Sequence, residues 1–547
     1  MKVVIVGGVA GGASAAARLR RLDEMAEIVL LERGEYISFA NCGLPYYIGG
    51  VIAEKAALTL QTPESFQQRF DVDVRVNNEV VAISRAGKTV TVKDTKTGEI
   101  YEQPYDKLIL SPGAQPIRPA FAQHERVFTL RNIPDAYRIK DYIDEQAPRR
   151  AVVIGGGVIG LEMAENLVES GLHVTVVEQA PHLVPALDID IACDLHRYAR
   201  RKGLELRLGC TATSIGEAED GTLAVALEGE TLSADLVVMA IGVRPDSALA
   251  EQAGLDMGAR GTIKVDIHMR SSDPDIYAVG DAVAVTDFVT GQSAHIPLAG
   301  PANRQGHIAA DHICGRDSSY KGTQGSAIFK FFDMTIASTG GNEKTLAAAG
   351  IEFDKVFLYS QSHAGYYPGG MPMSIKVLFG KADGRILGAQ VAGFIGVDKR
   401  CDLFAAVIRM GGTYEDLMEL ELCYAPPFGS AKDPVNMAGF VIENALDGVP
   451  QIHWHDVAPL PRDGSVTLLD VRRPAECELG MIEGFFNIEL DVLREHLHEI
   501  PKDRPVYVNC QSGLRSYLAC RILQGRGYDA TNVAGGYRLY SAVTGEL

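Results

Sequence analysis

Two cysteines lie in stretches whose residue types could perform sulfur chemistry. Cys42 lies in ISFANCGLPYYIGG, a loop before a predicted helix. Cys510 ends a predicted buried strand in VYVNCQSGLRSYLACRIL, and a short loop separates it from the next helix. The backbone N–H groups of this loop and the helix N-terminus should converge on the Cys510 sulfur, and Arg515 adds a positive charge. Such surroundings lower a thiol pKa and stabilise an anionic terminal sulfur.

The spacing around Cys510 distinguishes two kinds of chemistry. A cysteine phosphatase has a similar loop, but its arginine would occupy the position of Ser516. With Arg515 in place of that arginine the loop is tighter, which suits a persulfide better than a phosphate. We therefore favour a sulfur-transfer role for Cys510.

Cys42 has no second cysteine nearby, and the residue five positions after it is Tyr47. The nine cysteines are scattered, with no Cys-x-x-Cys pair, which indicates a reduced protein without a disulfide scaffold or a metal site. A lone redox cysteine can pair with a bound small thiol, cycle through a sulfenic acid, or cycle through a persulfide. The sulfenic acid route would make the protein a peroxidase or oxidase.

The N-terminal segment predicts a dinucleotide site. KVVIVGGVAGGASAAARLRRL reads as a strand, a turn and a helix, and EIVLLERG reads as a second strand that ends in Glu32. Val9 replaces the middle glycine of the usual fingerprint, while the Glu32 carboxylate is placed to bind a ribose. The turn carries Gly7, Gly8, Gly11 and Gly12.

A second dinucleotide site is predicted in RRAVVIGGGVIGLEMAENLVESGLHVTVVEQAP. Its glycines, Gly155, Gly157 and Gly160, have the full fingerprint spacing and precede a helix whose N-terminus would face the phosphates. Glu178 ends the next strand, where a carboxylate accepts hydrogen bonds from a ribose and repels a 2′-phosphate. Gln179 follows it in place of an arginine. We therefore prefer NADH to NADPH, which stays possible.

Three further strand ends follow in an order that predicts a flavin site. They are YDKLILSPGAQPIRP, ADLVVMAIGVRPDSAL and DIYAVGDAVAV. An aspartate after a strand, such as Asp281, can bind a flavin ribityl hydroxyl. Any one of these ends could be an ordinary strand terminus with a helix cap, so their shared order carries the prediction. The candidate residues are Pro112, Gly113, Gly242, Gly280 and Asp281.

These segments, over roughly residues 1–320, together resemble the flavoprotein disulfide reductases that have two dinucleotide-binding domains. The resemblance implies FAD on the first and third segments, NADH on the second, and a further domain that forms a homodimer. SFANCGLPYYIGG also resembles coenzyme A-disulfide reductase, whose single cysteine forms a mixed disulfide with coenzyme A. The CoA-binding residues that this implies are Ser14, Arg18, Arg21, Ser38, Asn41 and Lys432.

Two C-terminal motifs of the same family match HAGYYPGG and LCYAPPFGSAKD. The match implies that Tyr366, with Tyr367 as the adjacent candidate, and Tyr424 reach the partner subunit's active site, and that Ala425 contacts the flavin. No histidine stands in LCYAPPFGSAKD to act as acid or base. A tyrosine hydroxyl can instead hydrogen-bond a leaving thiolate and protonate it.

The C-terminal segment resembles a single-domain rhodanese, through DVR, the Cys510 loop and NVAGGY. The whole chain resembles fusions of CoA-disulfide reductase with rhodanese, including NADH-dependent persulfide reductases. This implies that Cys510 collects sulfane sulfur from a small-molecule persulfide or polysulfide, and that CoA carries it to Cys42. The alternatives are a CoA-disulfide reductase with an accessory rhodanese domain, an NADH peroxidase or oxidase, and a sulfur-relay interaction protein.

The predicted fold class is α/β, with two Rossmann-like dinucleotide-binding domains, an α+β dimerisation domain and an α/β rhodanese domain. The expected domains are FAD-binding (1–111 and 243–320), NAD(P)H-binding (112–242), dimerisation (321–445), a linker (446–460) and rhodanese (461–547).

Bulk properties exclude several partners. The formal net charge of −18 argues against nucleic-acid binding, which needs a basic surface. No apolar run approaches the roughly 20 residues that span a bilayer. Glycines interrupt the apolar N-terminal stretch, so it does not read as a signal peptide. We expect a cytoplasmic protein that binds neither membrane nor nucleic acid.

Overall fold

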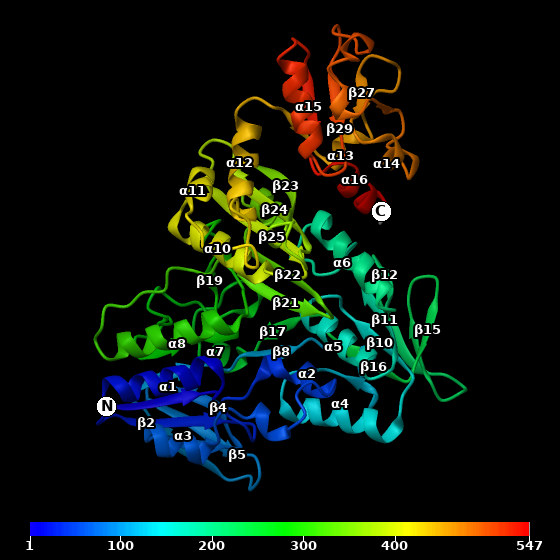
Figure 1. Ribbon diagram of the computed structural model, residues 1–547. Coiled ribbons are helices and arrows are strands. Elements are labelled where there is room, and N and C mark those ends of the chain that lie inside the picture. The colour runs from blue at the N-terminus through cyan, green and yellow to red at the C-terminus, as the bar shows by residue number, and fades with distance from the viewer. Residues whose placement is uncertain (546–547) are drawn as a thin grey trace. The chain divides into compact units, whose positions relative to one another are not determined.

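The computed structural model describes residues 1–545 (Figure 1). By proximity of Cα atoms the chain divides into two compact units. The first consists of Met1–Pro181 and Lys202–Gly325. The second consists of His182–Arg201 and the chain from Ser326 onward. Residues 182–201, which the sequence placed in the NAD(P)H-binding domain, thus belong to the second unit.

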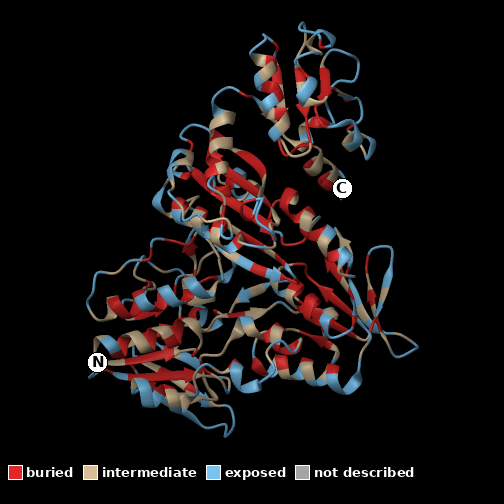
Figure 2. Cartoon of the chain, in the orientation of Figure 1, coloured by how far each residue is buried: buried red, intermediate tan, exposed pale blue. Residues whose placement is uncertain are grey.

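A parallel five-stranded sheet forms the base of the first unit, in the order β18-β7-β1-β2-β3. The strands are Ile276–Ala278, Lys107–Leu110, Lys2–Val6, Glu27–Glu32 and Asp73–Val76. Helix α1 (Ala10–Leu22) joins β1 to β2 and packs against α8 (Ala299–Ile313). The apolar runs of β1 and β2 are buried in one core with side chains of α1 and with Val80, Val90 and Val92, as is typical of a parallel sheet that is covered on both faces (Figure 2).

A second parallel sheet of the same unit has the order β12-β11-β10-β16-β9. Its strands are Glu205–Leu208, His173–Glu178, Arg150–Ile154, Leu236–Met239 and Val127–Phe128. Helix α5 (Val158–Glu169) joins β10 to β11. Each sheet therefore contains one strand–helix–strand unit of the kind that the glycine motifs predicted.

The second unit contains an antiparallel and a parallel sheet. The antiparallel sheet runs β21-β22-β25-β24-β23, with bounds Ala327–Phe331, Met334–Gly340, Ile386–Gly393, Pro372–Gly380 and Phe353–Gln361. Helices α6 (Ile189–Arg201), α10 (Val397–Met410) and α12 (Pro434–Leu446) pack on it.

The parallel sheet at the C-terminal end runs β26-β30-β29-β27-β28. Its strands are Gln451–Ile452, Ala530–Val533, Val506–Asn509, Thr467–Asp470 and Phe486–Asn487. Helices α14 (Pro474–Glu478), α15 (Leu514–Gln524) and α16 (Gly536–Thr544) accompany it. β26 lies within the stretch expected to be a linker, yet it pairs with β30. The predicted α/β fold class is confirmed.

Within residues 1–545 there is no helix that combines the length and the apolar character needed to cross a membrane.

A buried ion cluster attaches α6 and the residues before it to the antiparallel sheet. The Lys376 side chain, on β24, has no exposed surface, and its Nζ lies 2.8 Å from Asp190 Oδ1 and 2.9 Å from Asp188 Oδ2. Glu343 also binds this ammonium group. Burial alone would lower the pKa of Lys376, but the three carboxylates outweigh burial and raise it. The cluster is a structural reason why residues 182–201 belong to the second unit.

Removing this ammonium should destabilise the second unit. In Lys376→Met three carboxylates would remain close together without their central cation. We expect a loss of about 3 kcal/mol or more in the free energy of unfolding, measured by urea denaturation. Lys344→Met is the matched control, because Lys344 is exposed on the neighbouring helix. A Lys376→Met protein as stable as this control would contradict the interpretation.

Candidate redox and sulfur-transfer sites

The first glycine turn has space only for glycine at two positions. Gly7 has φ +97°, and a Cβ there would lie 2.1 Å from the Ser111 carbonyl oxygen. A Cβ at Gly12 would lie 1.9 Å from the Gly7 carbonyl oxygen. The Glu32 carboxylate accepts hydrogen bonds from the N–H groups of Gly8 (2.9 Å) and Gly34 (2.8 Å). A carboxylate offers about four lone pairs, so Glu32 can still accept from a ribose.

The second turn repeats this construction. A Cβ at Gly160 would lie 1.9 Å from the Gly155 carbonyl oxygen, and Gly155 has φ +111°. The Glu178 carboxylate accepts from the N–H groups of Gly156 (2.6 Å) and Ala180 (2.7 Å). No protein atom lies within 4 Å of a Cβ placed on Gly157, which leaves that backbone approachable. Open glycine backbone at a helix N-terminus fits a pyrophosphate, so both turns fit dinucleotides.

The remaining flavin candidates lie at strand ends beside these turns. Pro112 and Gly113 follow β7, and Gly280 and Asp281 follow β18, so they share the carboxyl edge of the first sheet with Gly7. Gly242 follows β16, next to β10 in the second sheet. The carboxyl edge of a parallel sheet is where such folds bind ligands.

The Cys42 loop is attached directly to the first glycine turn. The Ser38 N–H donates to the Gly8 carbonyl (2.8 Å), and Ser38 adopts a left-handed φ of +44°. Cys42 then lies in a short 3₁₀ helix (Asn41–Gly43) that continues into α2 (Leu44–Ile48). The Asn41 amide, oriented to satisfy its neighbours, donates to the Arg131 carbonyl (3.0 Å) and accepts from Arg131 Nη1 (2.9 Å). These bonds hold an exposed thiol next to the predicted flavin site.

Arg131 connects this loop to the other flavin candidates. Its Nη2 lies 3.5 Å from Asp281 Oδ2, and a Cβ at Gly113 would lie 2.6 Å from Nη2. Arg131 was not among the predicted site residues. It follows the strand β9 in an unremarkable sequence, LRNIPDAYRI, which contains no motif to indicate it.

Two carboxylates of the first unit act on the Cys42 thiol. Desolvation by neighbouring atoms raises the pKa of Cys42, and the charges of Glu162 and Asp281 raise it further. Glu162 lies on α5, and burial raises its own pKa to about 7. Tyr46 donates a long hydrogen bond (3.4 Å) to Glu162 Oε1. Tyr47, where a second redox cysteine might have stood, is buried.

The structure joins no two cysteines of residues 1–545 by a disulfide. Cys42 therefore has no sulfur partner bonded to it in the described chain.

The predicted CoA contacts differ in their surroundings. The Ser14 hydroxyl donates to Asn303 Oδ1 (2.7 Å), and Arg18 forms an ion pair with Asp311 (2.7 Å). Arg21 is exposed on α1. Lys432, in the second unit, is also exposed, with Nζ 6.0 Å from the centre of the Phe440 ring. Arg18 thus has its charge balanced within the chain, while Arg21 presents its guanidinium to solvent.

The predicted tyrosines come together in the second unit. The hydroxyls of Tyr366 and Tyr424 lie 2.9 Å apart, and both side chains are exposed, by 76% and 47%. The hydrogen bond with Tyr424 raises the pKa of Tyr366. Their loops are joined by the Ala364 N–H, which donates to the Gly429 carbonyl (2.9 Å). Tyr367 is also exposed, and its ring makes an edge-to-face contact with the His363 ring. Ala425 follows Tyr424 directly in the chain.

The Cys510 sulfur is buried and accepts hydrogen bonds from two donors. Cys510 follows β29, and its Sγ receives the Gly513 N–H (3.1 Å) and the Ser516 hydroxyl (3.2 Å). The NVAGGY segment packs closely behind the loop: a Cβ at Gly536 would lie 2.5 Å from the Cys510 carbonyl oxygen. The predicted N–H donor is therefore present. The Ser516 hydroxyl was not predicted as a donor, although Ser516 directly follows Arg515 in the same motif.

A buried salt bridge lies next to the strand end that carries Cys510. Arg472 of the DVR motif contacts Asp470 through Nε (3.0 Å) and Nη2 (2.9 Å), and both side chains are fully buried. Asn509 Nδ2 donates to the same carboxylate (2.9 Å). The Arg472 guanidinium also lies 4.2 Å from the centre of the Tyr537 ring. The DVR and NVAGGY motifs are thus in contact with each other next to the Cys510 loop.

Arg515 has a partner that the sequence analysis missed. Its Nη1 and Nη2 each lie 2.7 Å from an oxygen of Glu476, on α14. The guanidinium predicted to face Cys510 is therefore held by a carboxylate. No local pattern links two residues so far apart in the chain.

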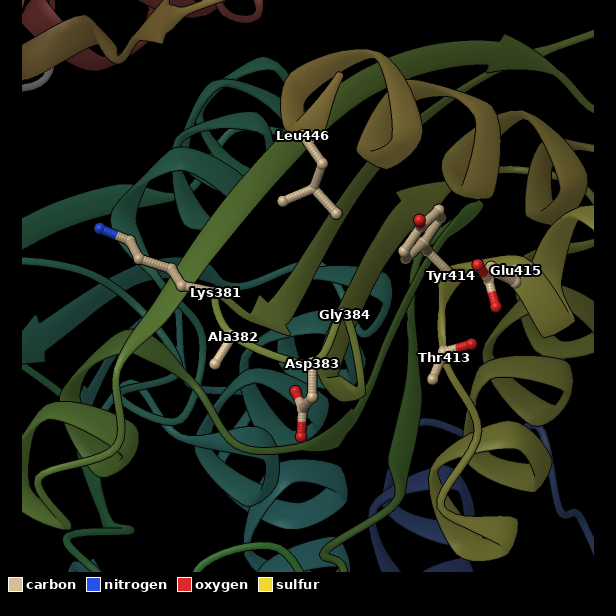
Figure 3. Close-up of a pocket in the computed structure, with 8 residues that line it drawn as sticks. All are labelled: Lys381, Ala382, Asp383, Gly384, Thr413, Tyr414, Glu415 and Leu446. Carbon is tan, nitrogen blue, oxygen red and sulfur yellow. The ribbon is translucent and has the colours of Figure 1, made fainter. Parts of the chain in front are cut away.

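A separate pocket of about 250 Å³ lies in the second unit (Figure 3). Lys381, Asp383, Tyr414 and Leu446 are among the residues that line it. It contains none of the predicted site residues.

Three family models match the chain in succession. Residues 1–306 match "Pyridine nucleotide-disulphide oxidoreductase", residues 326–434 match its dimerisation domain, and residues 454–542 match "Rhodanese-like domain". The first family implies FAD and NAD(P)H as cofactors.

Characterised relatives agree with these matches. A coenzyme A disulfide reductase of Staphylococcus haemolyticus is 36% identical over 440 residues, 80% of this chain and 98% of that protein. The crystal structure of reduced Bacillus anthracis CoADR-RHD is 51% identical with a TM-score of 0.97, covering 100% of this chain and 98% of that one. An NAD-dependent persulfide reductase from A. fulgidus is 36% identical with a TM-score of 0.92, covering 99% and 100%.

The glycine turns, the lone Cys42 and the Cys510 loop thus lie in a chain that matches the Bacillus anthracis structure over 100% of its length and the A. fulgidus structure over 99%. The resemblance stated from the motifs is confirmed: the chain belongs to the pyridine nucleotide-disulphide oxidoreductase family, in the group of CoA-disulfide and persulfide reductases that carry a C-terminal rhodanese-like domain.

Proposed function

We propose that this protein is an NADH-dependent reductase of persulfides and polysulfides, with CoA persulfide as the principal substrate class, and that it acts as a homodimer in the cytoplasm. One observation carries the proposal. The same chain has an exposed cysteine, Cys42, without a disulfide partner, in a loop bonded to the first dinucleotide turn. It also has a second cysteine, Cys510, whose buried sulfur accepts hydrogen bonds in a rhodanese-like domain.

Cys42 would perform the reductive step with CoA as its sulfur partner. FAD, when bound, passes the two electrons of NADH to sulfur. The Cys42 thiolate attacks the inner sulfur of CoA–S–SH, the S–S bond breaks, and hydrogen sulfide leaves with the electron pair and a proton. Two electrons then cleave the Cys42–S–S–CoA bond, which restores the thiolate and releases CoA–SH. The net reaction is NADH + H⁺ + CoA–S–SH → NAD⁺ + CoA–SH + H₂S.

The residues around Cys42 have separate roles in this scheme. Ser38 and Asn41 position the loop, and the exposed Arg21 supplies positive charge for CoA phosphates. Lys432 would add a further cation. The hydroxyl pair of Tyr366 and Tyr424 would reach the Cys42 site of the other subunit and protonate the leaving thiolate.

Cys510 would load sulfur onto the carrier. Its thiolate attacks the outer sulfur of R–S–SH, RS⁻ leaves, and Cys510–S–SH forms. The thiol of CoA then takes that outer sulfur, which regenerates Cys510 and gives CoA–S–SH for Cys42. Gly513 and Ser516 are placed to stabilise the anionic sulfur at both stages.

Glu178 supports NADH as the electron donor. Its buried carboxylate is held at the end of β11 by two N–H donors, where it would face the 2′ position of a ribose. A 2′-phosphate would meet this negative charge at close range.

A CoA-disulfide reductase is the second candidate. The match to the Staphylococcus haemolyticus enzyme over nearly all of that protein's length favours it. In that case the rhodanese-like domain would handle sulfur without feeding Cys42.

The Glu162 carboxylate should control the ionisation of Cys42. A nearby negative charge disfavours the thiolate, so Glu162→Gln should lower the pKa of Cys42. The rate of Cys42 alkylation by iodoacetamide should therefore rise at a lower pH than in the parent protein. Glu169→Gln is the matched control, because Glu169 is exposed on the same helix. An unchanged profile, or one moved to higher pH, would show that Glu162 does not act on the thiol.

Cys510→Ser should separate the two candidate functions. If Cys510 feeds Cys42, turnover of polysulfide with NADH should fall by roughly tenfold or more, because the loading thiolate is lost. Reduction of CoA disulfide should continue, since it needs only Cys42. Sulfide release and NADH oxidation are the two measurements.

Cys42→Ser is the control that should lose both activities. If Cys510→Ser reduced polysulfide as fast as the parent protein, the reaction would not require sulfur transfer through Cys510. Faster turnover of CoA disulfide than of any persulfide by the parent protein would favour the second candidate.

A further inference from the structure

A fixed negative charge holds the arginine that follows the Cys510 loop. Glu476 lies on α14 and receives both terminal nitrogens of Arg515 at 2.7 Å. The Arg473 N–H also donates to Glu476 Oε2 (3.1 Å). The hydrogen bonds with Arg515 lower the pKa of Glu476 to about 2, so the carboxylate is ionised throughout the physiological range.

The guanidinium of Arg515 is close enough to Cys510 to respond to its charge. The Cys510 thiolate is one of the groups that raise the pKa of Arg515, after Glu476. Yet Glu476 occupies both terminal nitrogens, so the pair as a whole presents no net charge to the loop. A sulfur donor that needs a free cation would have to compete with this carboxylate.

The other groups around Cys510 do not replace that cation. The two donors to its sulfur, Gly513 N–H and Ser516 hydroxyl, are neutral. Arg472 is already paired with the buried Asp470. The face of α15 beside Arg515 carries exposed apolar side chains, Leu514 (60%) and Leu518 (43%). Neutral donors and an apolar rim suit an organic sulfur carrier more than an inorganic dianion.

Two classes of sulfane-sulfur donor differ in what they demand of such a site. From thiosulfate, the Cys510 thiolate takes the outer sulfur, the S–S bond breaks, and sulfite leaves with the electron pair as a dianion. From an organic persulfide, R–S–SH, the same attack expels a thiolate with a single charge. The negative charge that develops on the leaving sulfite is stabilised by a free cation, whereas a nearby carboxylate repels it.

We propose that Glu476, by holding Arg515, is a specificity-determining residue that makes Cys510 accept sulfur from organic persulfides and discriminate against the inorganic dianion thiosulfate. This rests on the proposed function only in treating Cys510 as a sulfur acceptor. The carboxylate is a repulsive element placed against one donor class.

The test measures sulfur loading of Cys510 on the full-length protein without NADH. Thiosulfate and 2-hydroxyethyl persulfide are the two donors, and the gain of one sulfur atom is followed by mass spectrometry of the peptide that contains Cys510. The parent protein should load faster from the persulfide. In Glu476→Gln the ratio of the thiosulfate rate to the persulfide rate should rise by about tenfold or more, because the carboxylate is gone and Arg515 is released.

Three further variants make the result specific. Glu476→Asp keeps the charge and should keep the parent ratio. Glu476→Gln combined with Arg515→Gln should lose the gain, because no cation is left to release. Glu478→Gln, exposed on the same helix, should keep the parent ratio.

An unchanged ratio in Glu476→Gln, or faster loading of the parent protein from thiosulfate, would overturn the inference alone. Absence of loading from both donors would overturn the inference and the relay through Cys510 together. Neither result bears on NADH-driven reduction of CoA disulfide at Cys42, which is measured separately.

Discussion

Cleavage of a sulfur–sulfur bond by electron transfer needs two sulfur atoms, and Cys42 provides one. Tyr47 fills the space where a second cysteine could stand, and it is buried. Because no cysteine of residues 1–545 is bonded to Cys42, the proposed function brings the second sulfur to it on a bound molecule. Much of the architecture can be understood from this requirement, including an exposed thiol, an exposed cation on α1 and a second sulfur-handling domain in the same chain.

The charges near the sulfur atom differ between Cys42 in the first unit and Cys510 in the second. At Cys42, desolvation by neighbouring atoms and the charges of Glu162 and Asp281 raise the thiol pKa. At Cys510, two neutral groups donate hydrogen bonds to the sulfur, and Arg515 of the same segment is paired with Glu476. A thiol of raised pKa is a stronger nucleophile once ionised but is ionised less often. Cofactor and CoA binding would change the surroundings of Cys42, while the Cys510 cradle is complete within the chain.

Features set by local sterics could be predicted from the sequence. Gly7, Gly12, Gly155 and Gly160 each stand where a Cβ would collide with backbone, so the motif reports the fold directly. The loop after Cys510 was likewise predicted, because a strand end, a glycine and a helix start are adjacent in the chain. The lone Cys42 was recognised from the residues immediately around it.

Contacts between distant residues could not be predicted in this way. Arg515 and Glu476, Asn41 and Arg131, and Lys376 and Asp190 pair across long stretches of chain, with no periodic pattern to reveal them. The assignment of residues 182–201 to the second unit has the same origin. The buried Lys376 and the amide of Gln390 both bind Asp188 at the start of α6, although the sequence continues directly from the β11 strand that carries Glu178.

The central claim is that the redox partner of Cys42 is the sulfur of CoA. Mass spectrometry of the oxidised protein, denatured without reductant, tests this directly. The account predicts a CoA-sized adduct that maps to Cys42 and disappears on reduction. An adduct of oxygen alone at Cys42 would point to sulfenic acid chemistry, and either that result or an unmodified Cys42 would contradict the account.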